Sequence, residues 1–165
     1  ANGPCAIRYP KGSARGTFSA EEFSPLEWGK IEVLKKGEKV ALFAVGSMVE
    51  EAFEASQILE KEGLSITLVN ARFVKPLDEE GILKLILEHE ILFTLEENVL
   101  EGGFGSALLE LLSKKGISKR IIRLGLPSVF VEQGKREELL ERYGLKAHQI
   151  AKKVSDSLCD EKGKA

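Results

Sequence analysis

Residues 39–63 read KVALFAVGSMVEEAFEASQILEKEG, and the architecture of the chain follows from them. The run Val40–Val45 is apolar throughout, which is typical of a strand buried on both faces of a parallel sheet. Ser47 and Glu50 have the spacing of a capping box, so we expect a helix to begin there with its first N–H groups capped by the Ser47 hydroxyl. Gly63 is placed to end that helix. The stretch therefore predicts a buried strand followed directly by a helix.

The same alternation continues toward the C-terminus. Strands are expected at 65–71, 90–98 and 120–127, and helices after Pro76, after the glycines at 102–105, at 135–143 and at 146–158. Strand–helix alternation with short connections predicts a mostly parallel sheet covered on both faces, which makes a three-layer α/β/α sandwich.

A fifth strand is expected ahead of this unit, at residues 31–34. A tight turn at residues 35–38 joins it to the strand that begins at Val40, and a tight turn cannot make a parallel crossover. We therefore predict a five-stranded, mostly parallel sheet with one antiparallel strand. That first strand is either antiparallel to its neighbours or paired elsewhere at an edge.

The chain is expected to fall into four parts. Residues 13–29 have mixed polarity and fit neither the helical nor the strand period, so we interpret them as a linker. They separate residues 1–12 from the globular unit at 30–158. The first part holds AIRYPKG, which looks like the last strand of a domain whose body is missing, because so short a unit cannot fold alone. The polar residues 159–165 are expected to form a frayed tail.

Composition narrows the class of protein. The formal net charge of −2 argues against a nucleic-acid partner, because a phosphate backbone needs a concentrated cationic surface. No apolar run has the length of a membrane span, and we expect no signal peptide. Cys5 and Cys159 lack the spacing of metal ligands, and we expect them to be reduced and unpaired, as in a cytoplasmic protein.

Two turns at strand ends carry groups that could bind a ligand. The turn EENVLEGGFGS (residues 96–106) can offer backbone N–H groups to an anion, or its glycines can give a helix start the freedom it needs. Arg72 and Lys75 follow another strand, where α/β proteins form ligand crevices; the alternative is a turn with solvated or interdomain ion pairs. Neither of the common glycine-rich phosphate-loop motifs is present.

The remaining acid and base groups do not form a catalytic set. Glu96 and Glu97 are adjacent on a predicted strand and therefore point to opposite faces, which argues against an acid/base pair. His89 and His148 are expected on helices, without a nucleophile and a carboxylate arranged as a triad, so we interpret both as structural. We predict no catalytic residue in this chain.

Three cations lie close together near the N-terminus. Arg8, Lys11 and Arg15 surround Pro10 and Gly12 at the end of a predicted strand. They could clamp a phosphate group, or they could form a solvated basic loop. On chemistry alone both interpretations stay open.

Four segments taken together resemble the C-terminal part of the 1-deoxy-D-xylulose-5-phosphate synthase family. The resemblance runs from about residue 3 to about residue 155, with the motifs in the same order and at compatible spacings. The segments are GPCAIRYPKG (3–12), ARFVKPLDEE (71–80), TLEENVLEGGFGSALLE (94–110) and IIRLGLPSVFVEQGKREELLERYGL (121–145).

The resemblance implies a homodimeric transferase of three domains that uses thiamine diphosphate and Mg²⁺. Such an enzyme condenses pyruvate with glyceraldehyde 3-phosphate and releases CO₂, and its product feeds the synthesis of isoprenoids, thiamine and pyridoxal cofactors. The resemblance further implies that residues 30–158 are the transketolase C-terminal domain and that AIRYPKG ends the pyrimidine-binding domain.

The resemblance also suggests a role for the N-terminal cations. In this family the cation that follows Tyr-Pro helps to bind the substrate phosphate. Here Lys11 holds that position, which keeps the charge but lacks the two-pronged geometry of the usual arginine. Arg8 lies on the same predicted strand and is the second candidate for binding the phosphate.

The family's cofactor residues have no match in this sequence. There is no G-D-G segment for Mg²⁺ and diphosphate, and neither histidine fits a substrate motif. We therefore expect no cofactor or metal site in this chain. Alone it should be inactive, with a structural or dimerisation role beside the upstream domains. The alternatives are the C-terminal domain of a transketolase or of a 2-oxo-acid dehydrogenase β subunit, and a non-catalytic interaction module.

Overall fold

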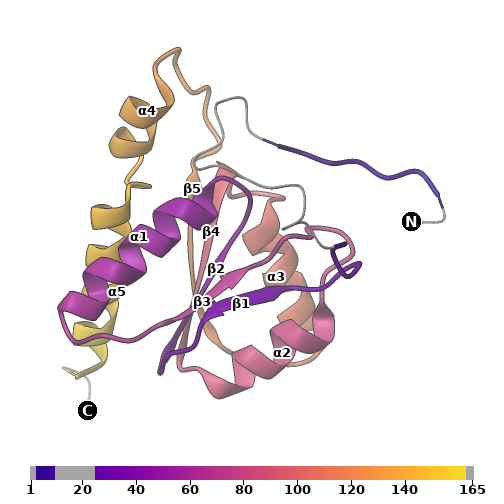
Figure 1. Cartoon of the computed structure of the whole chain (residues 1–165), viewed down its shortest axis with the longest axis horizontal. Coiled ribbons are helices and arrows are strands. Elements are labelled where there is room, and N and C mark those ends of the chain that lie inside the picture. Colours follow the sequence, from indigo (N-terminus) through magenta and orange to yellow (C-terminus); the bar gives the residue numbers. More distant parts are fainter. Residues whose placement is uncertain (1–2, 10–24, 163–165) are drawn as a thin grey trace.

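The computed structural model describes residues 3–9 and 25–162 (Figure 1). The strands are β1 (Glu32–Lys35), β2 (Val40–Ala44), β3 (Thr67–Asn70), β4 (Ile91–Val99) and β5 (Arg120–Leu126). The helices are α1 (Met48–Lys61), α2 (Glu79–Glu88), α3 (Phe104–Lys114), α4 (Arg136–Arg142) and α5 (Ala147–Lys162).

The five strands form one sheet in the order β1-β3-β2-β4-β5. β2 pairs in parallel with β3 and β4, and β4 pairs in parallel with β5. β1 pairs antiparallel with β3 at the edge of the sheet, which agrees with the tight turn that follows it. The predicted five-stranded, mostly parallel sheet with one antiparallel strand is confirmed.

Helices cover both faces of the sheet, with α1 and α5 on one side and α2 and α3 on the other (Figure 1). The central strand β2 shows the layering. Val40, Leu42 and Ala44 belong to the hydrophobic cluster shared with α1 and α5. Ala41 and Phe43 belong to the cluster shared with α2 and α3. Successive side chains of β2 point to opposite faces, and helices cover both faces, so every residue of β2 is buried. The predicted three-layer sandwich is confirmed.

The buried carboxylate of Glu51 in α1 forms hydrogen bonds to the start of α5. Glu51 of α1 accepts a hydrogen bond from the backbone N–H of Ala147 at 2.9 Å and another from Lys146 Nζ at 2.8 Å. The Ala147 N–H belongs to the first turn of α5, where backbone donors have no partner within the helix. Glu51 therefore caps α5 from a different helix and fixes the two side by side.

The ends of the chain lie outside the sheet. α5 continues to Lys162 and so enters the segment 159–165, for which the sequence predicts fraying. Residues 4–9 have no regular secondary structure and extend away from the sheet (Figure 1). Most of the predicted linker 13–29, namely residues 13–24, lies outside the described residues. Within the described chain, no helix combines the length and the apolar character that crossing a membrane requires.

Candidate functional site

Charged side chains gather at the carboxyl end of the sheet, around the last residues of β4. The pairing of β4 with β5 shifts between Leu95 and Val99, so this end of β4 carries a bulge. Gly125 of β5 faces it, and a Cβ atom at that position would lie 3.2 Å from Glu96 Cγ. Glu96 points toward the α3 side of the sheet and Glu97 toward the α1 side, as their adjacency on a strand predicts.

Glu96 is buried and caps α3. Its side chain is 3% exposed and accepts hydrogen bonds from the backbone N–H groups of Phe104, at 2.8 Å, and Gly105, at 2.9 Å. These two donors are among those that a helix start leaves without partners. The protein's own carboxylate thus occupies the place where the turn could have bound an external anion. The structure favours the interpretation of EENVLEGGFGS as a helix start.

The glycines of this turn are required by its backbone conformation and by close packing against Glu96 and Thr94. Gly102 has φ of +72°, a conformation that other residues rarely adopt. A Cβ atom on Gly103 would lie 2.2 Å from Glu96 Oε2, and one on Gly105 would lie 2.6 Å from Thr94 Oγ1. The turn therefore needs glycine for close packing as well as for backbone freedom. The motif alone does not show this, because it does not say where the Glu96 side chain points.

Glu97 binds two side chains on the opposite face. Ser47 Oγ donates to its carboxylate at 2.7 Å, and Arg136 donates from Nε at 2.9 Å and from Nη2 at 2.7 Å. The Glu97 and Arg136 side chains are 30% and 34% exposed, so the pair is only partly screened by solvent. The hydrogen bonds to Glu97 raise the pKa of Arg136 above its ordinary value. A charge-assisted two-pronged pair of this kind fixes orientation as well as distance.

The predicted capping box at the start of α1 is wrong. Ser47 is the residue before the helix, but its backbone is itself helical, with φ −59° and ψ −20°, and its side chain makes no cap hydrogen bond. A capping side chain normally requires an extended backbone at this position. The Ser47 hydroxyl instead donates to Glu97, which lies 50 residues further along the chain.

Arg8 brings the N-terminal segment to the same place. Its Nη2 donates to the backbone carbonyl oxygen of Glu97 at 3.3 Å, and the side chain is otherwise exposed. Lys11, the other predicted phosphate-binding residue, lies outside the described residues. We call the meeting point of these segments the Glu97 junction. It consists of Arg8, Ser47, Glu97 and Arg136.

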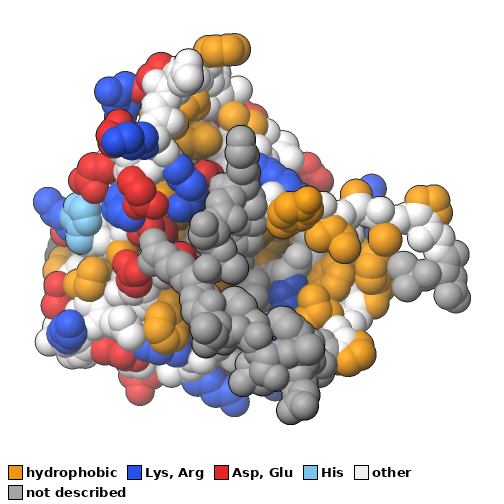
Figure 2. Space-filling model, turned by 45° about the horizontal axis from the view of Figure 1, so that its top comes forward, with side chains coloured by type: hydrophobic (Ala, Val, Ile, Leu, Met, Phe, Trp, Pro, Cys, Tyr) orange, Lys and Arg blue, Asp and Glu red, His pale blue; other side chains and the backbone are white. Residues whose placement is uncertain are grey.

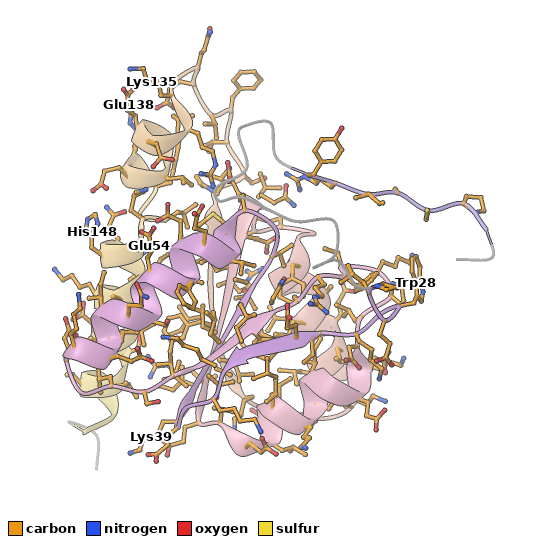
Figure 3. The ribbon with its side chains drawn as sticks, in the orientation of Figure 1. Trp28, Lys39, Glu54, Lys135, Glu138 and His148 are labelled. Carbon is orange, nitrogen blue, oxygen red and sulfur yellow. The ribbon has the colours of Figure 1, made fainter. Side chains whose placement is uncertain are left out.

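Arg136, the first residue of α4, connects the junction to this helix, and α4 stands beyond the carboxyl ends of the strands (Figure 1). Lys135 and Glu138 mark the outer end of this helix (Figure 3). Hydrophobic side chains gather on the side of the molecule from which the N-terminal segment extends (Figure 2). Two aromatic side chains that precede β1 in the sequence are exposed, Tyr9 by 81% and Trp28 by 55%. The described chain thus presents exposed apolar side chains as well as the charged junction.

The second predicted crevice, at Arg72 and Lys75, is a turn held by an ion pair. Arg72 Nη2 lies 2.6 Å from Glu32 Oε2 of β1, and Lys75 is exposed. The pair joins the end of β3 to the antiparallel edge strand. The structure therefore favours the ion-pair interpretation for Arg72.

Asp78 ties the same turn to the start of β1. It caps α2 through the backbone N–H of Gly81 at 3.1 Å, and it also accepts from the backbone N–H of Ile31 at 3.2 Å. Burial acts to raise the pKa of Asp78, but the two backbone hydrogen bonds together with the hydrogen bond and charge of Lys30 hold the pKa below its usual value. The carboxylate serves the fold at this position.

Both histidines have structural surroundings. His89 is buried, with Nδ1 2.6 Å from the Leu85 carbonyl oxygen and Nε2 2.7 Å from Thr67 Oγ1. His148 is exposed and lies 3.3 Å from a carboxylate oxygen of Glu141. Among the described side chains, at residues 3–9 and 25–159, no three from His, Cys, Asp or Glu are grouped to hold a metal ion.

The five-stranded α/β/α fold is that of a known protein family. Residues 29–150 match the model of the transketolase C-terminal domain, and the chain belongs to this family. The match begins just before β1 and ends within α5.

Within that class the curated relatives are 1-deoxy-D-xylulose-5-phosphate synthases, so the resemblance seen in the sequence is confirmed. The synthase of Dictyoglomus thermophilum is 44% identical over 160 residues, which are 97% of this chain and 26% of the relative. Synthase 2 of Geobacter sulfurreducens is 48% identical over 155 residues, 93% of this chain and 25% of the relative. The chain spans about a quarter of the length of these relatives.

Solved structures agree on the fold. A split-gene transketolase, described as an inactive β4 tetramer, is 34% identical with a TM-score of 0.76, covering 86% of this chain and 46% of that one. A transketolase from Pichia stipitis has a TM-score of 0.61 over 82% of this chain and 19% of its own. At 18% identity the second comparison shows the fold alone.

Proposed function

We propose that this chain is the C-terminal part of a 1-deoxy-D-xylulose-5-phosphate synthase. The enzyme is the thiamine-dependent transferase that joins pyruvate to glyceraldehyde 3-phosphate with loss of CO₂, at the start of isoprenoid, thiamine and pyridoxal cofactor synthesis. The observation that carries the proposal is the 44% identity to the Dictyoglomus thermophilum synthase over 97% of the chain. We place the enzyme in the cytoplasm, where free thiols such as Cys5 and Cys159 remain reduced.

In this proposal the chemistry belongs to the other domains. Thiamine diphosphate, with Mg²⁺, supplies the carbanion chemistry, and the residues that hold it lie outside this chain. The chain contributes a rigid sandwich whose carboxyl end contacts the upstream domains and a second copy in a homodimer. The exposed aromatic side chains of Tyr9 and Trp28 suit such contacts, because aromatic residues are enriched at interaction surfaces.

Lys11 and Arg8 are the residues proposed to meet the substrate. Both are cations near the end of the N-terminal segment, and a phosphate group is the anionic part of glyceraldehyde 3-phosphate. Arg8 is exposed, and among the described residues its guanidinium group, which carries five N–H donors, donates to the Glu97 carbonyl oxygen alone. Lys11 supplies charge without the two-pronged geometry of arginine.

A domain exchange tests the proposal directly. In the Dictyoglomus thermophilum synthase, the quarter that matches this chain is replaced by residues 1–165, and CO₂ release from pyruvate is followed with and without glyceraldehyde 3-phosphate. We expect activity within about tenfold of the parent enzyme. A matched exchange with the corresponding Pichia stipitis transketolase domain, which shares the fold alone, should be inactive. A folded exchange with this chain that releases no CO₂ would contradict the proposal.

Calorimetry tests whether the cofactor is held outside this chain. The chain alone is titrated with thiamine diphosphate in the presence of Mg²⁺. We expect no heat of binding, because the described residues offer neither a metal site nor a diphosphate loop. Saturable binding would place the cofactor site in this chain and contradict that expectation.

A further inference from the structure

Glu97 joins three segments that are far apart in the sequence. Its carboxylate binds Ser47, in the turn between β2 and α1, and Arg136, at the start of α4. Its carbonyl oxygen accepts from Arg8, 89 residues away. One residue at the end of one strand therefore touches a turn, a helix and the N-terminal segment that carries the proposed phosphate-binding cations.

The carboxylate holds the end of β4 from two sides. The Ser47 hydroxyl and the Arg136 guanidinium together give four contacts of 3.1 Å or less to its two oxygens. The bulge between Leu95 and Val99 takes this part of β4 out of regular pairing with β5, so the sheet alone does not fix the direction of the Glu97 peptide. Bulges of this kind redirect groups near functional sites.

We propose that Glu97 is a positioning residue for the substrate phosphate, an inference that rests on the proposed function. By fixing the peptide that accepts from Arg8, the carboxylate sets where the Arg8 guanidinium lies relative to the domain. Arg136 and Ser47 act through Glu97. None of the three touches the substrate.

The neighbouring Glu96 provides a matched control. It has the same side chain on the same strand, but its carboxylate binds only the start of α3 among the described residues and faces away from Arg8. A change from Glu to Gln at either position removes one charge in the same way. If the KM for glyceraldehyde 3-phosphate rises only because the protein is less stable, Glu96→Gln should raise it too. If it rises because the phosphate site is misplaced, only Glu97→Gln should raise it.

The experiment uses the intact synthase that carries this chain, with the variants Glu97→Gln and Glu96→Gln. For Glu97→Gln we expect the KM for glyceraldehyde 3-phosphate to rise about threefold to tenfold, with the KM for pyruvate and kcat little changed. For Glu96→Gln we expect a lower melting temperature and no change in the ratio of the two KM values.

Arg136→Met approaches the same junction from α4. We expect it to reproduce the rise in KM, and the double variant with Glu97→Gln to be no worse than the more affected single variant, because both break one interaction. Arg136→Lys, which keeps the charge, should restore part of the effect. Additive changes in the double variant would overturn the proposal.

Arg8→Ala separates the inference from the proposed function. If Arg8→Ala leaves the KM for glyceraldehyde 3-phosphate unchanged, Arg8 does not bind the phosphate and the inference about Glu97 is overturned. If Arg8→Ala raises that KM while Glu97→Gln does not, the phosphate role of Arg8 stands and the inference alone is overturned. An equal rise of both KM values in Glu97→Gln would also overturn it.

Discussion

Glu96 and Glu97 are adjacent on β4, but their carboxylates lie on opposite faces of the sheet and bind different kinds of partner. Glu96 is buried and binds backbone groups only 8 and 9 residues away, so it closes a local turn. Glu97 is partly exposed and binds groups 39, 50 and 89 residues away, so it connects distant segments. On this strand, a glutamate side chain therefore stabilises a local turn on the α3 face and holds distant segments together on the α1 face.

The largest expected effect is on the Glu96 face. Gly103→Ala places a methyl group against the Glu96 carboxylate, where the Cβ atom would lie 2.2 Å from Oε2. We expect the free energy of unfolding to fall by about 3 kcal/mol. A thermal melt should show a decrease of roughly 6 to 12 °C. Gly3→Ala is the control, since a Cβ atom there meets nothing within 4 Å. Equal melting temperatures for the two variants would mean that Glu96 does not hold this turn.

The second prediction compares the two glutamates directly. Glu96→Gln should lower the free energy of unfolding by about 2 kcal/mol, because a buried charged acceptor of two backbone bonds is lost. Glu97→Gln should lower it by about 1 kcal/mol or less, because that pair is partly exposed. Urea denaturation of both variants checks the order. A larger loss for Glu97→Gln would reverse the assignment of local and long-range roles.

A third change should stabilise the Glu96 face. Thr94 is fully buried beside Gly105, and among the described residues its hydroxyl has no hydrogen-bond partner. Thr94→Val keeps the shape and removes the unpaired group, so we expect a gain of about 1 kcal/mol in the free energy of unfolding. Denaturant unfolding checks it, with Thr67→Val as the control that should lose stability, since Thr67 bonds to His89. A loss for Thr94→Val would show that its hydroxyl is paired.

The smallest effect belongs to the Glu97 face. Ser47→Ala should lower the free energy of unfolding by about 0.5 kcal/mol, since it removes one partly exposed hydrogen bond. The loss should become smaller when Glu97 is already Gln, because the acceptor is then a neutral amide oxygen. A double-mutant cycle by urea denaturation measures this coupling. A loss of undiminished size in the Glu97→Gln background would point to a helix cap instead.

Local sequence patterns predicted the parts of the molecule that depend on local geometry. The apolar run Val40–Val45 predicted a strand buried on both faces, and β2 is such a strand. The period of two along a strand placed Glu96 and Glu97 on opposite faces before any contact was known. The tight turn ahead of Val40 predicted the antiparallel edge strand.

The site was less accessible to sequence reasoning because its contacts are long-range. Ser47 and Glu50 fit the capping-box pattern, but the Ser47 hydroxyl found a carboxylate 50 residues away. No local pattern in the sequence marks Arg136 as the partner of Glu97. The sequence signal for the junction is the pair of adjacent carboxylates at a strand end, because each of them needs hydrogen-bond donors on its own face of the sheet.

The carboxylate of Glu51 that caps α5 from α1 has a consequence for how the protein is made. The buried residues on the α2 and α3 side of the sheet end at Leu112, whereas those on the α1 side continue to Val154. A chain growing from its N-terminus therefore holds all the buried residues of one half of its core while the other half still lacks α5. Until α5 emerges from the ribosome, α1 packs on the sheet alone and Glu51 lacks the backbone N–H of Ala147, so we expect the nascent domain to wait with one apolar face only partly covered.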